Sequence, residues 1–209
     1  MKRTRRLAFP LLVGLFICVP AGAVLEKGAS FVPFALKNYD GRAFTLTLED
    51  GRLTLLSEET RDGRTSLAKS HPAAVLLDFW ATWCVPCRAA MPYMQQLHDK
   101  YKPAEGQETG GLRLFGVALD LKGSLVVKPF YAKLKYTYPM LADPTTAAAG
   151  DTLVRTTQDM KAKYKVQDIP VVYLIDAKGT ITHVHVGFKK EFIAEIEAAV
   201  VTLVKGEAK

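Results

Sequence analysis

The chain has 209 residues, of which 49% are hydrophobic, and carries a formal charge of +7 at pH 7. Four of its positive residues lie within residues 1–23, which contain no acid, so the rest of the chain carries a formal charge of only +3. That length suffices for one domain with a full hydrophobic core. The basic residues do not cluster with aromatic residues as in a nucleic-acid groove, which excludes nucleic acid as the partner.

Residues 1–23 are typical of an export signal rather than of a folded segment. A basic start at residues 2–6 precedes an apolar stretch at residues 7–19, which is too short to span a bilayer comfortably. An Ala-Gly-Ala tripeptide at residues 21–23 fits a cleavage site. We therefore predict a periplasmic or otherwise extracytoplasmic protein that loses this signal and Cys18 with it. An uncleaved signal that anchors the protein to a membrane is the alternative.

Residues 24–70 are predicted to form an N-terminal extension made of a β-meander. Asp-Gly-Arg tripeptides begin at residues 40, 50 and 62, and the segment 43–48 alternates apolar and polar residues. Asp-Gly between alternating runs is a strong hairpin signal, so strands are expected between residues 31 and 67. Residues 71–209 are then predicted to form the main domain.

The main domain alternates predicted strands with predicted helices. Short apolar runs predict strands, and longer segments with one apolar face predict helices. The strands are expected at residues 73–80, 112–119, 138–141, 171–175 and 180–186, and the helices at residues 85–102, 124–136, 157–164 and 189–204. This order predicts an α/β fold with a mixed sheet that is covered by helices on both faces.

Cys84 and Cys87 form a Cys-x-x-Cys pair between the strand predicted at 73–80 and the helix predicted at 85–102. The first sulfur therefore lies at a helix N-terminus, where free N–H groups and the macrodipole favour a thiolate, the form that attacks disulfides. Without Cys18 no other cysteine remains, so a disulfide-stapled domain and a structural zinc site both lack ligands. The pair is predicted to be catalytic, with no metal and no cofactor besides its own redox-active disulfide.

With its surroundings, this pair resembles the thioredoxin superfamily, in particular the TlpA/ResA-like branch of exported thiol–disulfide oxidoreductases. The resemblance covers about residues 70–205 and implies a thioredoxin-like fold. The matching segments are Asp78-Phe79-Trp80-Ala81-Thr82-Trp83-Cys84-Val85-Pro86-Cys87-Arg88, Met91-Pro92, Tyr138-Pro139 with Leu141, and Ile169-Pro170 followed by Tyr173-Leu174-Ile175-Asp176 and Gly179. The β-meander is longer than the short hairpin expected in this branch.

By this resemblance, the two cysteines have different roles. Cys84 is the thiolate that attacks a substrate disulfide, and Cys87 is the thiol that resolves the mixed disulfide. Pro170 is a cis-proline that faces the disulfide. A peroxidase is a weaker interpretation, because the lone peroxidatic cysteine in a Thr-rich loop that it needs is missing.

The resemblance also implies where substrates bind. Trp83, Val85 and Pro86 are expected at the docking surface around the cysteines. Ile169, just before Pro170, is expected to pair its backbone with an extended substrate strand, a contact that accepts many sequences. The Val85-Pro86 dipeptide and the family favour a reductant of specific substrates over a general oxidant.

Asp78 is a lone carboxylate in an otherwise apolar predicted strand, six residues before Cys84. Thioredoxins carry a buried Asp at the matching place. A desolvated carboxyl there has a raised pKa and can take the proton from Cys87 as that thiol resolves a mixed disulfide. Asp78 is therefore the third predicted catalytic residue, and an exposed Asp at the strand end is the alternative. The chain departs from relatives in having Ala90 where many have an acidic residue, and no lysine on strand 112–119 to pair with Asp78.

These residues predict an exported thiol–disulfide oxidoreductase that reduces disulfides of specific secreted or membrane-anchored proteins, in cytochrome c or copper-site maturation. Its partners would be disulfide-containing proteins and a membrane thiol electron donor of the DsbD/CcdA type. The alternative is a Cu(I)-binding and delivery module that uses the Cys84/Cys87 pair, because soft thiolates suit Cu(I). His183 and His185 share a strand face, which we interpret as solvated rather than as a copper site.

Overall fold

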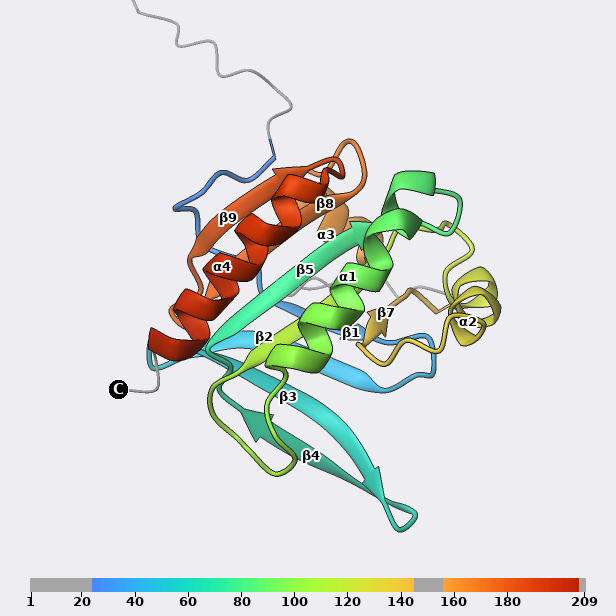
Figure 1. Ribbon diagram of the computed structural model, residues 1–209. Coiled ribbons are helices and arrows are strands. Elements are labelled where there is room, and N and C mark those ends of the chain that lie inside the picture. Colours follow the sequence, from blue (N-terminus) through green and yellow to red (C-terminus); the bar gives the residue numbers. More distant parts are fainter. Residues whose placement is uncertain (1–23, 145–155, 207–209) are drawn as a thin grey trace, which may run out of the picture.

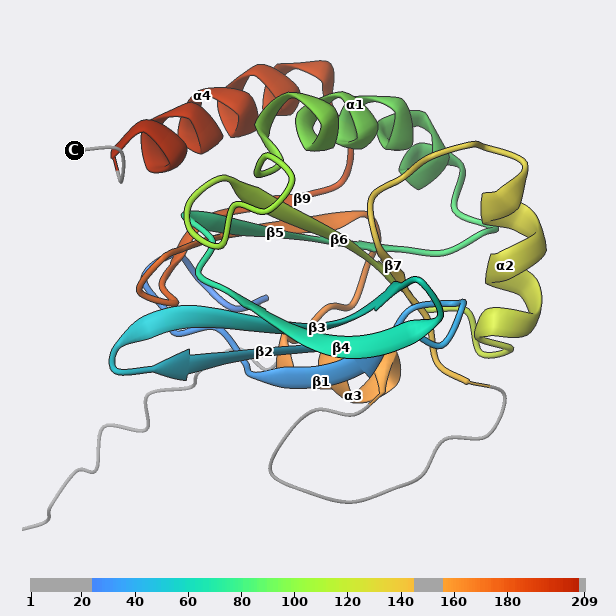
Figure 2. The ribbon, with the colours of Figure 1, turned by 90° about the horizontal axis from the view of Figure 1, so that it is seen from below.

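The computed structural model describes residues 24–144 and 156–206 (Figure 1). The predicted export signal, residues 1–23, lies outside the described residues. In the part of the chain that is described, no helix is both long and apolar enough to cross a membrane. The elements stack in layers with a mixed sheet in the middle, as the view in Figure 2 shows.

The middle layer is a five-stranded sheet with the order β7-β6-β5-β8-β9. Its strands are β5 (Ala74–Trp80), β6 (Leu112–Ala118), β7 (Met140–Leu141), β8 (Val171–Asp176) and β9 (Ile181–Val186). β5 pairs in parallel with β6 and antiparallel with β8. Every residue of β5 is buried, because this central strand has a layer against each of its faces. The predicted mixed sheet is confirmed.

Helices cover one face of this sheet. α1 (Val85–Tyr101) and α4 (Lys190–Gly206) lie side by side over it, and α2 (Ser124–Ala132) lies at its β7 edge (Figure 2). The buried residues of α1 are Cys87, Ala90, Met91, Met94 and Leu97. Most of them join Leu76 of β5 and Leu114 of β6 in one hydrophobic cluster. The helix that carries the cysteines is therefore fixed to the sheet along its apolar face.

A second, antiparallel sheet covers the opposite face of the middle sheet. It has the order β1-β2-β3-β4, with β1 (Phe34–Lys37), β2 (Ala43–Glu49), β3 (Arg52–Arg61) and β4 (Arg64–Ser70). The short helix α3 (Thr157–Lys163) lies on the same side. Helices are thus present on both faces, as predicted, but the larger cover on this side is the predicted β-meander itself.

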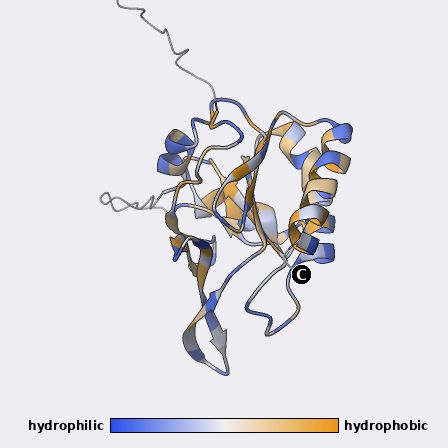
Figure 3. Ribbon diagram, turned by 90° about the vertical axis from the view of Figure 1, so that its left-hand side faces the viewer, coloured by the Kyte–Doolittle hydropathy of each residue, from blue (hydrophilic) through white to orange (hydrophobic). Residues whose placement is uncertain are grey.

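The meander covers the middle sheet because its alternating sequence gives it an apolar inner face. Phe34, Leu46 and Leu53 are fully buried and belong to one hydrophobic cluster with residues of β5, β6 and β8. The rings of Phe34 and Phe44 meet Phe115 of β6 edge-on, at centroid distances of 6.0 and 5.3 Å. Figure 3 shows the hydrophobic residues gathered between the layers. The predicted extension therefore supplies about a third of the buried residues of a core that it shares with the catalytic sheet.

Two Asp-Gly pairs form hairpin turns, as their sequence predicts. Asp50-Gly51 joins β2 to β3, Asp62-Gly63 joins β3 to β4, and all four residues have positive φ. Positive φ at both central residues defines the type I′ turn that Asp-Gly favours. The first four residues of β4, from Arg64, are exposed, and this end of the hairpin projects beyond the layers (Figure 1).

The helix predicted at 124–136 is shorter than expected, because α2 ends at Ala132. The chain then turns back, with a hydrogen bond from the Tyr131 hydroxyl to the Tyr138 carbonyl at 2.7 Å. The rings of Tyr131 and Tyr138 also pack edge-on at 5.7 Å. These tertiary contacts outweigh the local helical pattern, which carries no information about them.

Candidate active site

The Cys84–Cys87 disulfide lies where β5 ends and α1 begins. The two Cα atoms are 5.3 Å apart. Cys84 is the N-cap residue of α1, and Cys87 lies in its first turn. The exposed fraction is 4% for Cys84 and 1% for Cys87. The first cysteine is the more accessible of the two, which agrees with the attacking role expected of it.

The start of α1 favours a negative charge on Cys84. Its Sγ accepts a hydrogen bond from the backbone N–H of Cys87 at 3.2 Å, and the first turn of the helix contains no acidic side chain. The positive end of the helix dipole and this N–H therefore both stabilise the thiolate that reduction produces. Ala90, three residues after Cys87, is buried and brings no charge that would oppose this effect.

The segment before β8 also meets the disulfide. The Ile169–Pro170 peptide bond is cis, and the carbonyl oxygen of Ile169 lies 3.8 Å from Cys84 Sγ. The Pro170 carbonyl accepts a hydrogen bond from the N–H of Gly187 at 2.8 Å, which ties this segment to the end of β9. Residues 85 positions apart in the sequence thus meet at the sulfur atom.

Exposed apolar side chains flank Cys84 and lie at the edge of the sheet where β5 ends. Trp83 and Val85, on either side of Cys84, are 69% and 68% exposed, and Pro86 is exposed as well. Three further exposed residues lie next to the ends of elements at this edge: Leu121 after β6, Leu125 at the start of α2 and Val186 at the end of β9. We call Trp83, Val85, Leu121, Leu125 and Val186 the apolar rim. Patches of this kind mark surfaces that bind partners.

Asp78 lies inside β5 and is only 1% exposed. Strand alternation places it on the same face as Leu76 and Trp80, which is the face covered by α1. Its neighbours in register are Gly116 of β6 and Val172 of β8. The structure therefore has a buried carboxyl under the cysteine helix, and the alternative of an exposed strand-end Asp is wrong.

The surroundings of Asp78 change its proton affinity. Among the described residues, neither of its carboxyl oxygens has a hydrogen-bond partner. Burial without a partner disfavours the charged form, and this desolvation raises the pKa of Asp78 to about 7. A carboxyl with this pKa exchanges a proton near neutral pH, which is the property that a proton acceptor for Cys87 needs.

Asp120 is a residue of the site that sequence reasoning missed. It follows β6 and is 6% exposed. Its carboxylate accepts hydrogen bonds from the backbone N–H and the hydroxyl of Thr82, at 3.0 and 2.6 Å. These bonds hold the segment that carries Trp83 and Cys84 against the end of β6. The sequence shows a carboxylate after a buried strand, but the partner 38 residues away depends on the fold.

The Asp120→Asn variant is expected to lower the free energy of unfolding by about 1 kcal/mol, because an amide keeps one acceptor oxygen but loses the charge that strengthens both bonds. Chemical denaturation of the oxidised protein measures this change. Asp99→Asn is the matched control, since Asp99 of α1 also accepts two side-chain hydrogen bonds, from Gln95 and Lys102, but at an exposed site. A surface substitution of this kind should stay within about 0.5 kcal/mol. An equal loss of unfolding free energy in the two variants would show that Thr82 needs no charged partner.

His183 and His185 do not form the solvated strand face that the sequence predicts. Both are partly buried, and His185 packs on Phe192 of α4 with ring centroids 4.7 Å apart. Desolvation lowers the pKa of both imidazoles. The alternation of β9 shows that they share a face, but not that α4 covers it. Within residues 24–144 and 156–206, no group of three or more His, Cys, Asp and Glu side chains could hold a metal ion.

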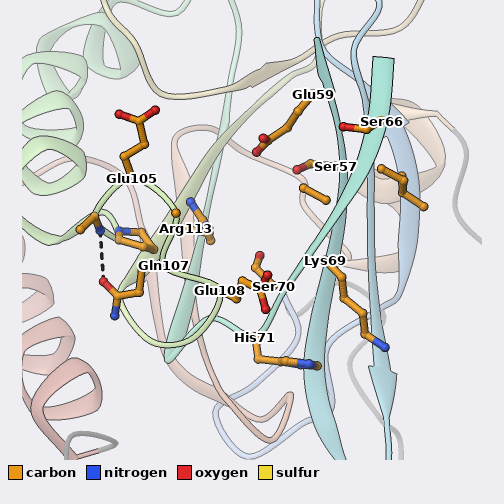
Figure 4. Close-up of a pocket in the computed structure, with 15 residues that line it drawn as sticks. Ser57, Glu59, Ser66, Lys69, Ser70, His71, Glu105, Gln107, Glu108 and Arg113 are labelled. Carbon is orange, nitrogen blue, oxygen red and sulfur yellow. Dashed lines mark hydrogen bonds between the residues drawn. The ribbon is translucent and has the colours of Figure 1, made fainter. Parts of the chain in front are cut away.

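A polar cavity of about 670 Å³ lies away from the disulfide, between the β3–β4 hairpin and the loop after α1 (Figure 4). Glu59 and Lys69 of the hairpin, Arg113 of β6 and Glu105 of the loop are among the residues that line it. None of the site residues predicted from the sequence lines this cavity. The disulfide, rather than the cavity, is therefore the candidate active site.

Comparison with known proteins relates the whole architecture to a family. The model of the AhpC/TSA family matches residues 28–184. The protein named thiol-disulfide oxidoreductase ResA from Oceanobacillus iheyensis is 33% identical over 135 residues, which cover 65% of this chain and 60% of that protein, less than two thirds of its length. A protein of the same name from Bacillus cereus is 27% identical over 190 residues, which cover 90% of this chain and 91% of the relative.

Solved structures are similar over most of the chain. A Chlorobium tepidum protein assigned as a thiol:disulfide interchange protein DsbE is 25% identical with a TM-score of 0.58, and the match covers 86% of this chain and 99% of that one. The thioredoxin domain of a thiol-disulfide oxidoreductase from Bacteroides vulgatus, 18% identical, matches with a TM-score of 0.56 over 84% of this chain and 99% of its own, a likeness of fold alone. These matches confirm the predicted thioredoxin-like fold.

Proposed function

The chain belongs to the AhpC/TSA family, and from this premise we propose that it is an exported reductase of disulfides in specific secreted or membrane-anchored proteins. That it is a thiol–disulfide oxidoreductase follows from its relatives and from the Cys84–Cys87 pair. The direction of the reaction, the export and the substrates are the proposed part. The observation that carries the proposal is the apolar rim around Cys84, because a protein substrate requires such a surface and a small thiol does not.

In the proposed reaction, the reduced cysteine pair gives two electrons to one substrate disulfide. The Cys84 thiolate attacks one sulfur, forms a mixed disulfide and releases the other sulfur as a thiolate. Cys87 then gives its proton to Asp78, and its sulfur attacks Cys84 Sγ. The second substrate sulfur leaves as a thiolate, the Cys84–Cys87 disulfide closes, and Asp78 returns its proton to solvent or to the leaving thiolate.

The proposed substrates are extended segments that carry a cysteine pair, such as apocytochromes c before haem attachment or copper sites before metal loading. Two observations support an extended segment. Cys84 is only 4% exposed, so a rigid folded surface would have difficulty presenting a disulfide to it. The Ile169 carbonyl lies 3.8 Å from Cys84 Sγ, so the backbone beside the sulfur is placed to meet the backbone of a bound strand.

The proposed cycle needs an electron donor outside the cytoplasm. The basic and apolar start of the sequence supports a periplasmic or otherwise extracytoplasmic location. A membrane thiol donor of the DsbD/CcdA type would reduce the Cys84–Cys87 disulfide after each turnover. In this proposal the disulfide is the redox group, and no further cofactor takes part.

A Cu(I)-delivery module that uses the same two sulfurs is the rival function, and one pair of measurements separates the two. The reduced protein without residues 1–23 is mixed with a disulfide-containing protein, and is separately titrated with Cu(I) against a competing chelator. We expect one disulfide reduced per Cys84/Cys87 pair, with the copper left on the chelator. Copper that stays on the protein, with no disulfide reduced, would favour the rival. Cys84→Ser is the control, since it should be inactive in the first measurement.

A further inference from the structure

Tyr138 is a second buried polar residue on the Asp78 side of the sheet. It is 1% exposed, and among the described residues its hydroxyl oxygen has no hydrogen-bond partner. A buried hydroxyl without a partner is unfavourable and calls for an explanation. The Tyr138 carbonyl already accepts the hydrogen bond from Tyr131, so the backbone of this residue is fixed while its hydroxyl is uncommitted.

Tyr138 and Met140 pack over Gly116, the small residue beside Asp78 in the sheet. Gly116 is the register partner of Asp78 on the neighbouring parallel strand. A Cβ atom placed on Gly116 would collide with Sδ and Cε of Met140 and would lie 3.3 Å from Tyr138 Cε2, so Met140 and the edge of the Tyr138 ring together fill the space over Gly116. Neighbouring strands are about 4.8 Å apart. Tyr138 lies in the same cluster as Leu76 and Trp80, which share the face of Asp78. Besides burial, the charge of Asp78 raises the pKa of Tyr138, so the phenol lies within electrostatic reach of that carboxyl.

The other polar groups near Asp78 are committed or distant. Trp80 Nε1 donates to Met140 Sδ at 2.6 Å, and the Tyr131 hydroxyl is bound to the Tyr138 carbonyl. His185 lies one strand further away, because Val172 stands between it and Asp78 in the register. On α1, Cys87 is the group whose proton Asp78 is proposed to accept. Tyr138 is thus the uncommitted donor near Asp78 among the residues that the structure describes.

The groups behind Tyr138 do not carry a competing charge at neutral pH. Its ring packs against Tyr136, with centroids 6.1 Å apart, and against His98 of α1, with centroids 6.2 Å apart. Burial lowers the pKa of His98 to about 4; Lys102 and Arg113 lower it further, while Asp99 opposes them. His98 is therefore neutral near pH 7. Burial also raises the pKa of Tyr138, so that its hydroxyl keeps its proton and remains a donor.

We propose that Tyr138 is a positioning residue for the resolving step: its hydroxyl donates a hydrogen bond to the ionised carboxylate of Asp78 and holds it in the state that accepts the proton of Cys87. The bond forms when Asp78 is ionised, because a carboxylate accepts a hydrogen bond more strongly than a neutral carboxyl does. When Asp78 accepts the proton, the bond weakens and the carboxyl is released. This inference rests on the proposed function, since it concerns the proton that Cys87 loses.

Tyr138→Phe tests the proposal because it removes the hydroxyl and keeps the ring. Loss of a hydrogen bond to the charged form should raise the apparent pKa of Asp78 by about one unit. The titration is followed in the reduced protein by the carbon-13 NMR signal of the Asp78 carboxyl, which does not depend on enzyme activity. Tyr136→Phe is the matched control, because it removes a hydroxyl from the same aromatic cluster and should leave the titration unchanged.

The second measurement follows the reaction itself. Reduced protein is mixed with dithiobis-nitrobenzoate, whose first coloured thiolate leaves when Cys84 attacks and whose second leaves when Cys87 resolves the mixed disulfide. In Tyr138→Phe we expect an unchanged rate of the first release and a rate of the second release that is about fivefold lower at pH 7. Near pH 9 the second-release rates of the variant and the wild type should become equal, because Asp78 is then ionised in both. In an Asp78→Asn background, Tyr138→Phe should change nothing further.

Three outcomes would overturn the proposal: an Asp78 titration that is the same in Tyr138→Phe and the wild type, a second release slowed equally at every pH, or a further slowing in the Asp78→Asn background. The last two would assign Tyr138 a structural role only. Failure of the proposed function looks different, because the wild-type protein would then leave protein disulfides unreduced while the Asp78 titration still reports on Tyr138.

Discussion

Replacing Cys87 with serine is expected to abolish turnover and to leave substrates attached to Cys84 through a disulfide. A serine hydroxyl cannot attack the Cys84 sulfur, so the reaction stops at the mixed disulfide. Loss of a residue that takes part in covalent catalysis lowers turnover by more than about a thousandfold. Non-reducing electrophoresis of cell extracts, followed by mass spectrometry of the slow-migrating species, identifies the attached proteins.

The control for this trap is the Cys84→Ser variant. It keeps the more deeply buried sulfur of Cys87, which is 1% exposed, and removes the sulfur at the helix N-terminus. We expect it to be inactive and to capture nothing. Equal capture by the two variants would contradict the assignment of Cys84 as the attacking thiolate. Captured proteins that lack a cysteine pair would contradict the proposed substrate class.

Asp78→Asn is expected to slow the second release of coloured thiolate by about 10–100-fold and to leave the first release unchanged. The reason is that Asp78 acts on Cys87, whereas the Cys84 thiolate is stabilised by the helix N-terminus. In the wild type the second release should become faster as the pH rises through about 7, because Asp78 ionises there. The variant should lack this step in its pH profile. A first release slowed as much as the second would give Asp78 a structural role.

The same substitution should change how stability depends on pH. The pKa of Asp78 in the folded protein, about 7, lies above its ordinary value of 3.8. Between these two values the folded protein holds a proton that the unfolded chain has lost, so the free energy of unfolding falls as the pH rises from about 4 to about 7. Asn cannot titrate, and the fall should be smaller in the variant. Thermal denaturation of the wild type and of the variant, each at pH 5 and at pH 8, measures how far stability falls in each protein.

The sequence allowed the redox centre to be predicted because its signals are local. The Cys84/Cys87 spacing, the strand before it and the helix after it lie within one continuous segment. The type I′ turns at Asp50 and Asp62 are equally local, since two residues determine their backbone conformation. The burial of Asp78 also follows from its apolar neighbours, all of which lie in one strand.

The parts that could not be predicted depend on which elements face each other. The alternation of residues 43–48 shows an apolar face, but not that this face closes over β5 and β6. The bond between Asp120 and Thr82 requires the parallel pairing of β5 with β6, which places the ends of both strands at one edge. The position of Tyr138 beside Asp78 depends on the same register, through Gly116. Each of these contacts joins residues that are distant in the sequence.

The projecting end of the β3–β4 hairpin offers a site for attaching probes to this protein. The Asp62-Gly63 turn is a two-residue loop, and the first residues of β4 after it are exposed. Exposed loop tips are where inserted sequences are best tolerated. Figure 1 shows this tip at the far end of the molecule from the start of α1, where the cysteines lie. A fluorophore or an immobilisation tag placed there would leave the thiols and the apolar rim unobstructed, so that single catalytic cycles can be observed on a surface.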